Sequence, residues 1–520
     1  MRARRQDGAT VGHDPRDGSR PVPPAPTSSD FVVDYTPDLA AAAPSGTAPI
    51  VADQLGLLSP AFVLGAYALA ASAAAAAAAG APRADDHADQ AVNGDLARAA
   101  TGLTGAGIKV GILSDSFNVL GGAATDMADG DLPANVQVLE EGPAGSHDEG
   151  RAMAELVHQI APGAQILFHT ATNGAADFAA GIASLVAAGC NVIVDDVAYL
   201  NEPFFQEGGI VQTAVANAVA AGASYFTAAG NEGTDYIQQG FAPLHLVLPG
   251  LPAGAAVQNF GSIAAPRPWL DVTIPPGAQG IFDLQWDQTY AAAAGSLGLA
   301  LFDANGNLVA SAAADVAGGA PDQILSFTNT GANTDAAGSF RLVLYMNGGS
   351  TPPGLFKIVA FGGGTIVDPA AGSGSGSVIG HEMMPGANTV GAMAWSAAPR
   401  FGGSNTPEGY SSVGVGTFLL DANGTPLAAP QSTQKVDFLA PDGSITSVLA
   451  PFDGTSAAAA NAAGVAALVL QADPALSPAQ LTQVLEATAA PAHGAALAAG
   501  AGLLQANAAV QMAMALTGTH

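Results

Sequence analysis

The chain has 520 residues, more than one compact core usually holds, so we expect two or three structural units. Its formal net charge of −29, from 43 acidic and 14 basic residues, argues against nucleic-acid or anionic-membrane partners, because both would repel such a surface. The single cysteine, Cys190, excludes an intrachain disulfide and a cysteine-rich metal site, and we interpret it as a buried, unreactive thiol.

The first 95 residues differ in composition from the rest of the chain. Residues 1–53 are rich in Pro, Ala, Asp and Gly, and residues 61–81 are dominated by alanine and carry no charge. Residues 61–81 are long enough to cross a bilayer, but alanine drives insertion weakly. No Lys or Arg stands close before them, as a signal peptide would require. We therefore interpret residues 1–95 as a leader or linker that could be a pro-segment, and we expect no stable membrane insertion.

Strands and helices alternate in residues 96–240. Apolar runs such as "IKVGIL" and "NVIVDD" have the length of buried strands, and "DFAAGIASLVAAG" and "IVQTAVANAVAAG" have helical spacing. This order predicts an α/β domain with a parallel sheet and helices on both faces. Chemistry in such a domain gathers at the carboxyl ends of the strands. Four polar residues follow predicted strands: Asp115, Asp195, Asp196 and Asn231.

The pattern changes between residues 241 and 368. Short alternating runs such as "WLDVTIPPGAQGIFDLQW" and "FRLVLYMNG" are separated by turns, and "ANGN" stands between two apolar runs as a hairpin turn would. We therefore predict an all-β sandwich inserted into the α/β domain. The α/β pattern returns in residues 369–512, which we assign to the second part of the same domain, and residues 513–520 form a tail.

A glycine turn places Ser456 at the start of the long apolar helix in "GTSAAAANAAGVAALVLQ". A serine in this position can direct its hydroxyl outward, with backbone N–H groups nearby to stabilise an oxyanion. Taken alone, such a serine more often caps its helix than acts as a nucleophile. Its interpretation therefore depends on the other polar residues of the chain.

These residues resemble the catalytic set of the subtilisin family in their chain order. The matching stretches are "KVGILSDSF", "EGRAMAELVHQIAPGA", "AAGNEG" and "GTSAAAANAAG", and the resemblance covers about residues 100–240 and 370–510. It implies a subtilisin-like fold in which Ser456 is the nucleophile, Asn231 donates to the oxyanion and Asp115 is the acidic member of the catalytic set.

The base position departs from the family. Members read His-Gly-Thr ahead of the helix, whereas this chain reads Glu-Gly-Arg at residues 149–151. Three interpretations stay open: Glu149 has replaced the histidine, His147 serves after reshaping of the entry loop, or no functional base is left. A helix that begins near Glu149 places it one turn before Met153, on the apolar, inward side. His158 is about half a turn out of phase with Glu149, so we expect it to face solvent.

A glutamate base implies a different working pH, because a free carboxyl has a pKa near 4.3 and an imidazole one of about 6.5. A second carboxylate nearby can share the proton, and Asp115 is placed for that. The related sedolisin family is similar in using Glu, Asp and Ser on a subtilisin-like fold. Sedolisins carry Asp where this chain has Met153, and they use Asp at the oxyanion where it has Asn231. The two resemblances together imply a hybrid site with best activity at acidic pH.

Two further residues are candidates for the substrate cleft. Asp195 and Asp196 end one predicted strand, and alternation allows only one of them to face the cleft. The register favours Asp196, although a carboxylate that caps loop N–H groups is an equal interpretation. Gly230, directly before Asn231, is the second candidate.

We therefore expect a serine endopeptidase that acts as a monomer on protein or peptide substrates, outside the cell or at its surface. The chemistry requires no cofactor, and we assign no metal ligands. The resemblance implies calcium, but no acidic loop identifies a site for it. The alternative is a catalytically inactive homologue that serves as a surface or binding module through its β-sandwich.

Overall fold

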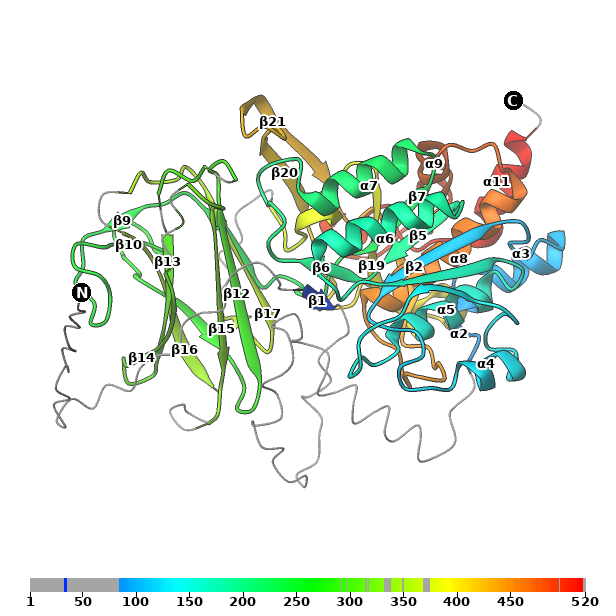
Figure 1. Ribbon diagram of the computed structural model, residues 1–520, viewed down its shortest axis with the longest axis horizontal. Helices are drawn as coiled ribbons and strands as arrows, with labels where there is room; N and C mark the ends of the chain where they lie inside the picture. Colours follow the sequence, from blue (N-terminus) through cyan, green and yellow to red (C-terminus); the bar gives the residue numbers. More distant parts are fainter. Residues whose placement is uncertain are drawn as a thin grey trace, which may run out of the picture.

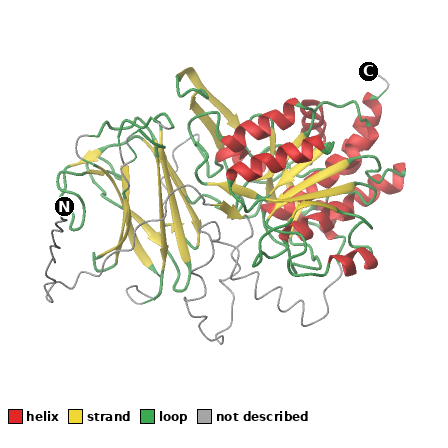
Figure 2. Cartoon of the chain, in the orientation of Figure 1, coloured by secondary structure: helices red, strands yellow, loops and turns green. Residues whose placement is uncertain are grey.

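A computed structural model describes residues 32–34 and 84–517, apart from residues 291, 296, 314–315, 317, 332–337, 348–349, 368–374 and 495. An α/β part and an all-β part lie side by side (Figure 1). Figure 2 shows strands and loops in the all-β part, and helices around a central sheet in the α/β part. The alanine-rich segment of residues 61–81 lies outside the described residues.

The central sheet has seven parallel strands, which confirms the predicted α/β fold class. In sheet order the strands are β22 (Phe438–Asp442), β19 (Ala387–Ala394), β7 (Ser224–Ala228), β5 (Val192–Asp195), β2 (Lys109–Ser114), β4 (Gln165–Thr170) and β3 (Gln137–Glu140). The strands inside the sheet are buried along nearly their whole length, because helices cover both faces, whereas the edge strand β3 is partly exposed.

The two faces of the sheet pack against different helices. Val110 and Ile112 of β2 belong to one apolar core with α5 and α8, whereas Leu113 belongs to a second core with α6 and α7. The helices are α2 (His87–Ala91), α3 (Gly94–Thr101), α4 (Ala123–Asp129), α5 (Glu149–Ile160), α6 (Ala175–Ala187), α7 (Ile210–Ala220), α8 (Thr455–Ala472), α9 (Pro478–Thr488), α10 (Ala496–Ala499) and α11 (Ala506–Leu516). Ser477 caps α9 as an N-terminal serine should, since its side chain accepts the N–H of Gln480.

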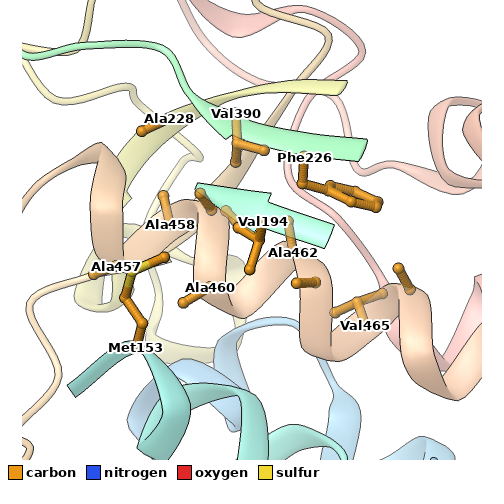
Figure 3. Close-up of a cluster of buried hydrophobic side chains, with 14 of the residues drawn as sticks. Met153, Val194, Phe226, Ala228, Val390, Ala457, Ala458, Ala460, Ala462 and Val465 are labelled. Carbon is orange, nitrogen blue, oxygen red and sulfur yellow. The ribbon is translucent and has the colours of Figure 1, made fainter. Parts of the chain in front are cut away.

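Helix α8 runs through the middle of the domain. Within the described part of the chain it is the helix long and apolar enough to cross a membrane, but 89% of it is buried inside the domain, as expected of a core helix. Its small side chains let α5 approach closely: Met153 lies beside Ala457 (Figure 3), and a Cβ added at Gly464 would lie 2.9 Å from Cβ of Ile160. The first contact joins the amino-terminal parts of the two helices and the second joins residues about two turns further along each helix, so α5 and α8 run parallel.

The all-β part is a sandwich of one seven-stranded and one four-stranded sheet. The larger sheet holds β9 (Pro243–Leu244), β10 (Ala256–Gln258), β11 (Leu270–Thr273), β13 (Leu297–Asp303), β14 (Leu308–Ala312), β16 (Ser339–Met346) and β18 (Thr365–Ile366). The smaller holds β8 (Tyr236–Gln239), β12 (Gln279–Trp286), β15 (Asp322–Thr328) and β17 (Phe356–Gly362). The sandwich therefore starts at β8, shortly before residue 241. The predicted "ANGN" turn joins β13 to β14.

The sandwich is fixed to the α/β part by the side chain of Gln285 on β12. Its amide nitrogen donates to the carbonyls of Leu200 at 2.8 Å and Glu202 at 3.0 Å, and its amide oxygen accepts the N–H of Phe204 at 3.0 Å. Residues 200–204 follow β6 (Val197–Tyr199), which comes after β5. The sandwich thus holds a loop at the carboxyl edge of the central sheet.

Further elements of the described chain lie between the sandwich and α8. Three short 3-10 helices and one hairpin occur there: η4 (Gly380–Met383), η5 (Trp395–Ala397), η6 (Pro399–Phe401), and strands β20 (Val415–Leu420) and β21 (Pro426–Gln434). The hairpin projects from the α/β part (Figure 1).

Candidate active site

Asp115 follows β2, and its carboxylate lies at the amino end of α5. The carboxylate accepts the backbone N–H groups of His147 at 2.5 Å and Glu149 at 2.8 Å, and also that of Ser116. The hydroxyl of Thr170, at the end of β4, donates to the carbonyl of Asp115 at 2.7 Å. The N–H groups at a helix start have no acceptor within the helix, so an anionic side chain is stabilised there.

Asp148 stands directly before α5 in a left-handed conformation, with φ of 60°. Its carboxylate accepts the hydroxyl of Ser116 at 2.8 Å and the N–H of Val119 at 2.7 Å, and it pairs with Arg151 at 3.0 Å. These contacts fix the loop after β2 beside the helix start. The role of Asp148 could not be predicted from the sequence, because its partners come together only in the folded chain.

Gly150 allows the start of α5 to lie directly on β4. A Cβ at this position would come within 2.3 Å of Cε2 of Phe168 and within 2.8 Å of the carbonyl oxygen of Ser116. Both distances are shorter than any ordinary contact, so a side chain here would push the helix start away. Glycine at residue 150 therefore places the neighbouring Glu149.

Glu149 and Ser456 stand at the amino ends of two parallel helices. Glu149 is the first residue of α5 and Ser456 the second residue of α8, and both side chains are fully buried. The hydroxyl of Ser456 has no hydrogen-bond partner among the described residues. A buried hydroxyl usually has one, so Ser456 is an exception in this part of the site.

Asn231 is tied to the residue before Ser456. Its amide oxygen accepts the backbone N–H of Thr455 at 3.1 Å and the hydroxyl of Thr455 at 3.0 Å. The same hydroxyl accepts the N–H of Gly230 at 3.2 Å. With its oxygen held in this way, the Asn231 side chain presents its NH₂ group as a hydrogen-bond donor beside the start of α8.

Asp195 and Asp196 lie in different surroundings. Asp195 accepts hydrogen bonds from Thr227 at 2.9 Å and contacts Nε2 of His381 at 3.1 Å. Asp196 accepts the hydroxyl of Ser114, the last residue of β2, at 3.0 Å. Val194, two residues before Asp196, packs on α8 (Figure 3), so alternation turns Asp196 to the α8 side and Asp195 to the other.

The histidines of this region have different positions. His147 lies beside Asp115, with Nδ1 3.9 Å from Oδ2, and 15% of its side chain is exposed. His158 was expected to face solvent, but it is half-buried and burial lowers its pKa. The reason is that α5 is enclosed by the domain on nearly every side, and its other residues except Gln159 are buried. His158 lies in the last turn of the helix, far along from Glu149.

Strand β6 pairs with a piece of the chain's own amino-terminal region. Residues 32–34 form β1 (Val32–Asp34), which runs antiparallel to β6, with residue 32 opposite Tyr199 and residue 34 opposite Val197. β6 begins directly after Asp196, so the carboxyl end of β1 is the end closer to that residue. The edge of β6 is thus able to accept an extended peptide segment.

Comparison with known families connects these residues. The family model described as "Subtilase family" (Peptidase_S8) matches residues 142–503, which is more than half of the chain. The chain belongs to the subtilase family. The match includes Glu149, Asn231 and Ser456, and it supports a serine peptidase. Asp115 precedes the matched range, and its hydrogen bond with the N–H of Glu149 connects it to the same site.

Solved structures similar to this subtilase are proteases. The CspB protease of Clostridium perfringens has a TM-score of 0.51 at 13% identity, over 83% of this chain and 98% of that one. MycP1 of Mycobacterium smegmatis has a TM-score of 0.37 at 15% identity, over 83% and 85%. Fervidolysin of Fervidobacterium pennivorans, a keratinolytic enzyme related to subtilisin, has a TM-score of 0.36 at 14% identity, over 82% and 45%. At such identities the likeness shows the fold alone. A search of curated proteins found no match.

Asp442 is a residue of the subtilase site that the sequence analysis missed. It ends β22, accepts the N–H of Gly454 at 2.8 Å and accepts the hydroxyl of Tyr410. Burial raises the pKa of Asp442 to about 7. Gly454 directly precedes Thr455 and Ser456, so Asp442 helps to hold the turn ahead of Ser456. The strand-end rule that selected Asp115 could also have found it.

Two other features of the subtilase concern the predictions for its cysteine and for metal binding. Cys190 is buried, as predicted, and burial raises the pKa of its thiol to about 12. One set of metal-ligating side chains occurs within the described residues: Glu140, His169 and Asp177. Calcium prefers ligands that are all oxygen, so a set with an imidazole does not fit the calcium that the family resemblance implied.

Proposed function

We propose that this subtilase is an endopeptidase in which Ser456 attacks a peptide carbonyl and Glu149 accepts the serine proton. The observation that carries the proposal is that Glu149 and Ser456 begin two parallel, contacting helices, with Asp115 bound to the N–H of Glu149. A serine peptidase needs a base at the nucleophile, and Glu149 is a fully buried carboxylate at that end of the helix pair.

The proposed reaction has two halves, formation and hydrolysis of an acyl-enzyme. In each half Glu149 first accepts a proton and then donates it. The Oγ atom of Ser456 forms a bond to the peptide carbon while its proton passes to the carboxylate of Glu149. The tetrahedral oxyanion is stabilised by the amide NH₂ of Asn231 and by N–H groups at the start of α8. Glu149 then gives the proton to the leaving amine, and the peptide C–N bond breaks. In the second half, Glu149 takes a proton from water while the water oxygen bonds to the acyl carbon; the ester bond to Oγ of Ser456 then breaks, and Glu149 returns the proton to that oxygen.

Asp115 supports Glu149 in two ways in this proposal. Its carboxylate binds the N–H of Glu149 and so fixes the helix start that carries the base. Its negative charge also favours proton uptake by a neighbouring carboxylate, because two anions close together repel each other. A base of this kind works on the acidic side of neutrality, where the carboxylate pair holds and releases one proton.

His147 is the competing base, and the geometry favours Glu149. His147 also lies near Asp115, but it precedes the helix and the left-handed residue Asp148, and its side chain is partly exposed. Glu149 belongs to α5 itself, one turn before Met153, which lies beside the residue that follows Ser456 (Figure 3). This position in the helix supports Glu149 rather than His147 as the proposed base.

The substrate would bind as an extra strand. The antiparallel pairing of β1 with β6 supports an extended peptide at this edge, held by backbone hydrogen bonds. Residues 32–34 lie within the leader, and their pairing supports a pro-segment that occupies this edge before cleavage. Asp196 and Gly230 would then line the path from β6 to Ser456. The strongly acidic composition fits a monomer that acts outside the cell, and the reaction at Ser456 needs no cofactor.

The test is cleavage of an unfolded protein by the purified chain at pH values from 3 to 9, with products sequenced by mass spectrometry. We expect internal cleavages that are fastest on the acidic side and absent from the Ser456→Ala variant. If no Ser456-dependent cleavage occurs at any pH, the proposal fails, and the inactive binding module becomes the better interpretation.

A further inference from the structure

We propose that Glu140, His169 and Asp177 form a binding site for a divalent transition-metal ion of the zinc type. The three residues come from the end of the edge strand β3, the end of β4 and the first turn of α6. One ligand atom from each residue lies within 4.8 Å of the other two. Because they are supplied by three separate elements, the fold itself brings them together.

His169 is prepared to act as a ligand through one nitrogen. Its Nδ1 lies 2.8 Å from the carbonyl oxygen of Thr170, which fixes a proton on Nδ1 and leaves a lone pair on Nε2. Nε2 lies 3.5 Å from Oε2 of Glu140. Metal-binding histidines commonly hold their second nitrogen on a carbonyl in this way. The imidazole is 5% exposed, so this arrangement is built into the domain.

The ring position depends on a glycine of α6. A Cβ at Gly181 would lie 2.7 Å from Nδ1 of His169 and 2.9 Å from its Cε1. The absence of a side chain at residue 181 therefore lets the imidazole lie flat against the helix. In this position its Nε2 faces the two carboxylates.

The carboxylates are arranged to complete the site. Oε1 of Glu140 accepts the side-chain amide of Asn173 at 2.7 Å, which orients the carboxylate. Oδ2 of Asp177 is buried and has no hydrogen-bond partner among the described residues. A buried carboxylate oxygen without a partner is costly, and a bound cation would satisfy it.

The chemical types of the three ligand atoms indicate which class of metal ion the site would bind. One imidazole nitrogen and two carboxylate oxygens suit zinc and its neighbours in the first transition row, whereas calcium and magnesium prefer oxygen alone. Zinc–ligand bonds of about 2.0 Å place adjacent ligand atoms about 3.3 Å apart in a tetrahedron. The 3.5 Å between Nε2 of His169 and Oε2 of Glu140 is close to that spacing. Three protein ligands leave a fourth position for water.

The proposed ion would join the edge strand to the rest of the domain. It would link β3 to β4 and to α6, next to Thr170, whose hydroxyl supports the carbonyl of Asp115. We therefore assign the ion a structural role at the margin of the active site. This inference stands whether or not Glu149 is the catalytic base.

Isothermal titration of the Ser456→Ala protein with zinc chloride at pH 7 tests the site, with calcium chloride as the comparison ion. We expect one saturable zinc site, a thermal midpoint raised by zinc, and no comparable effect of calcium. Cobalt(II) in place of zinc should give the visible absorption of a low-coordinate site.

Variants assign the binding to these residues. Glu140→Gln and Asp177→Asn should each weaken zinc affinity at least tenfold, and His169→Gln should abolish binding. Gly181→Ala should weaken it while keeping all three ligands. The matched control is Asp129→Asn, which changes an exposed carboxylate at the end of α4 and should leave affinity unchanged. No saturable zinc binding with a Kd below about 100 µM, or binding that survives in all three ligand variants, would overturn the proposal.

Discussion

The carboxylate of Asp115 accepts the backbone N–H of Glu149 at 2.8 Å, which joins the end of β2 directly to the start of α5. The contact places two acidic residues together at the end of the sheet where α8 presents Ser456. In the proposed site, this contact is what connects the glutamate base to its acidic neighbour.

Glu149→Gln should lower kcat by about 10²–10⁴-fold, the usual contribution of a general base. His147→Ala, the matched control, should change kcat by less than about threefold, because His147 only borders Asp115 in this account. Steady-state hydrolysis of a peptide substrate at pH 4–5 measures both. Glu149→His should recover activity with an optimum moved toward neutral pH, since imidazole has the higher pKa. Equal losses in Glu149→Gln and His147→Ala would contradict the assignment.

Asn231→Ala should lower kcat by about 10²–10³-fold with little change in KM, because an oxyanion donor acts mainly in the transition state. Thr455→Val should cost less. It removes the hydroxyl that holds the amide oxygen of Asn231 but keeps the backbone N–H that also holds it. Both variants are compared with wild type by their separate kcat and KM values. A rise in KM alone would indicate that Asn231 binds substrate in its ground state.

Thermal stability should fall as the pH rises from about 4 to 7. Burial raises the pKa of Glu155 and Glu232 to about 8 and that of Asp442 to about 7. The corresponding pKa values in the unfolded chain lie near 4, so in this window the folded state keeps protons that the unfolded state releases. The free energy of unfolding is then greatest below pH 4 with respect to these groups and is lost as the pH approaches their folded-state pKa values.

Calorimetry of the Ser456→Ala protein at pH 4, 5, 6 and 7 measures this trend. Glu232→Gln should make the decrease of Tm with pH less steep, because one of the responsible groups no longer titrates. A Tm that increases steadily from pH 4 to pH 7 would show that these carboxyls are ionised in the folded protein.

Gly150→Ala should impair both folding stability and catalysis. The added Cβ would collide with the ring of Phe168 and the carbonyl of Ser116, and relief of such overpacking costs about 1–3 kcal/mol. The shifted helix start would also carry Glu149 away from its place. Gly409→Ala is the control, because a Cβ there meets no atom within 4 Å. Chemical denaturation and peptide hydrolysis should both separate the two variants; similar values for the two would mean that α5 tolerates displacement.

The fold class could be predicted from the sequence because apolar patterns typical of strands and of helices alternate along the chain. The order of the strands in the sheet depends on how these elements pack. Ser456 and Asn231 were recognised because each stands in a short local motif. Asp115 was found through its place at a strand end, and Asp442 satisfies the same rule. These features depend on residues close together in the chain.

The missed features depend on contacts between distant residues. Asp195 meets His381 across 186 positions, and nothing near either residue indicates the other. The prediction that His158 faces solvent was wrong, because its burial depends on elements that enclose α5 from outside. The metal set of Glu140, His169 and Asp177 likewise has no recognisable spacing, since its members come from three elements.

The most direct test of the account is labelling of Ser456 by a fluorophosphonate probe at pH values from 3 to 9. The account predicts labelling that is lost in Ser456→Ala, strongest on the acidic side, greatly slowed in Glu149→Gln and little changed in His147→Ala. Labelling that peaks above pH 8, disappears in His147→Ala and persists in Glu149→Gln would contradict it.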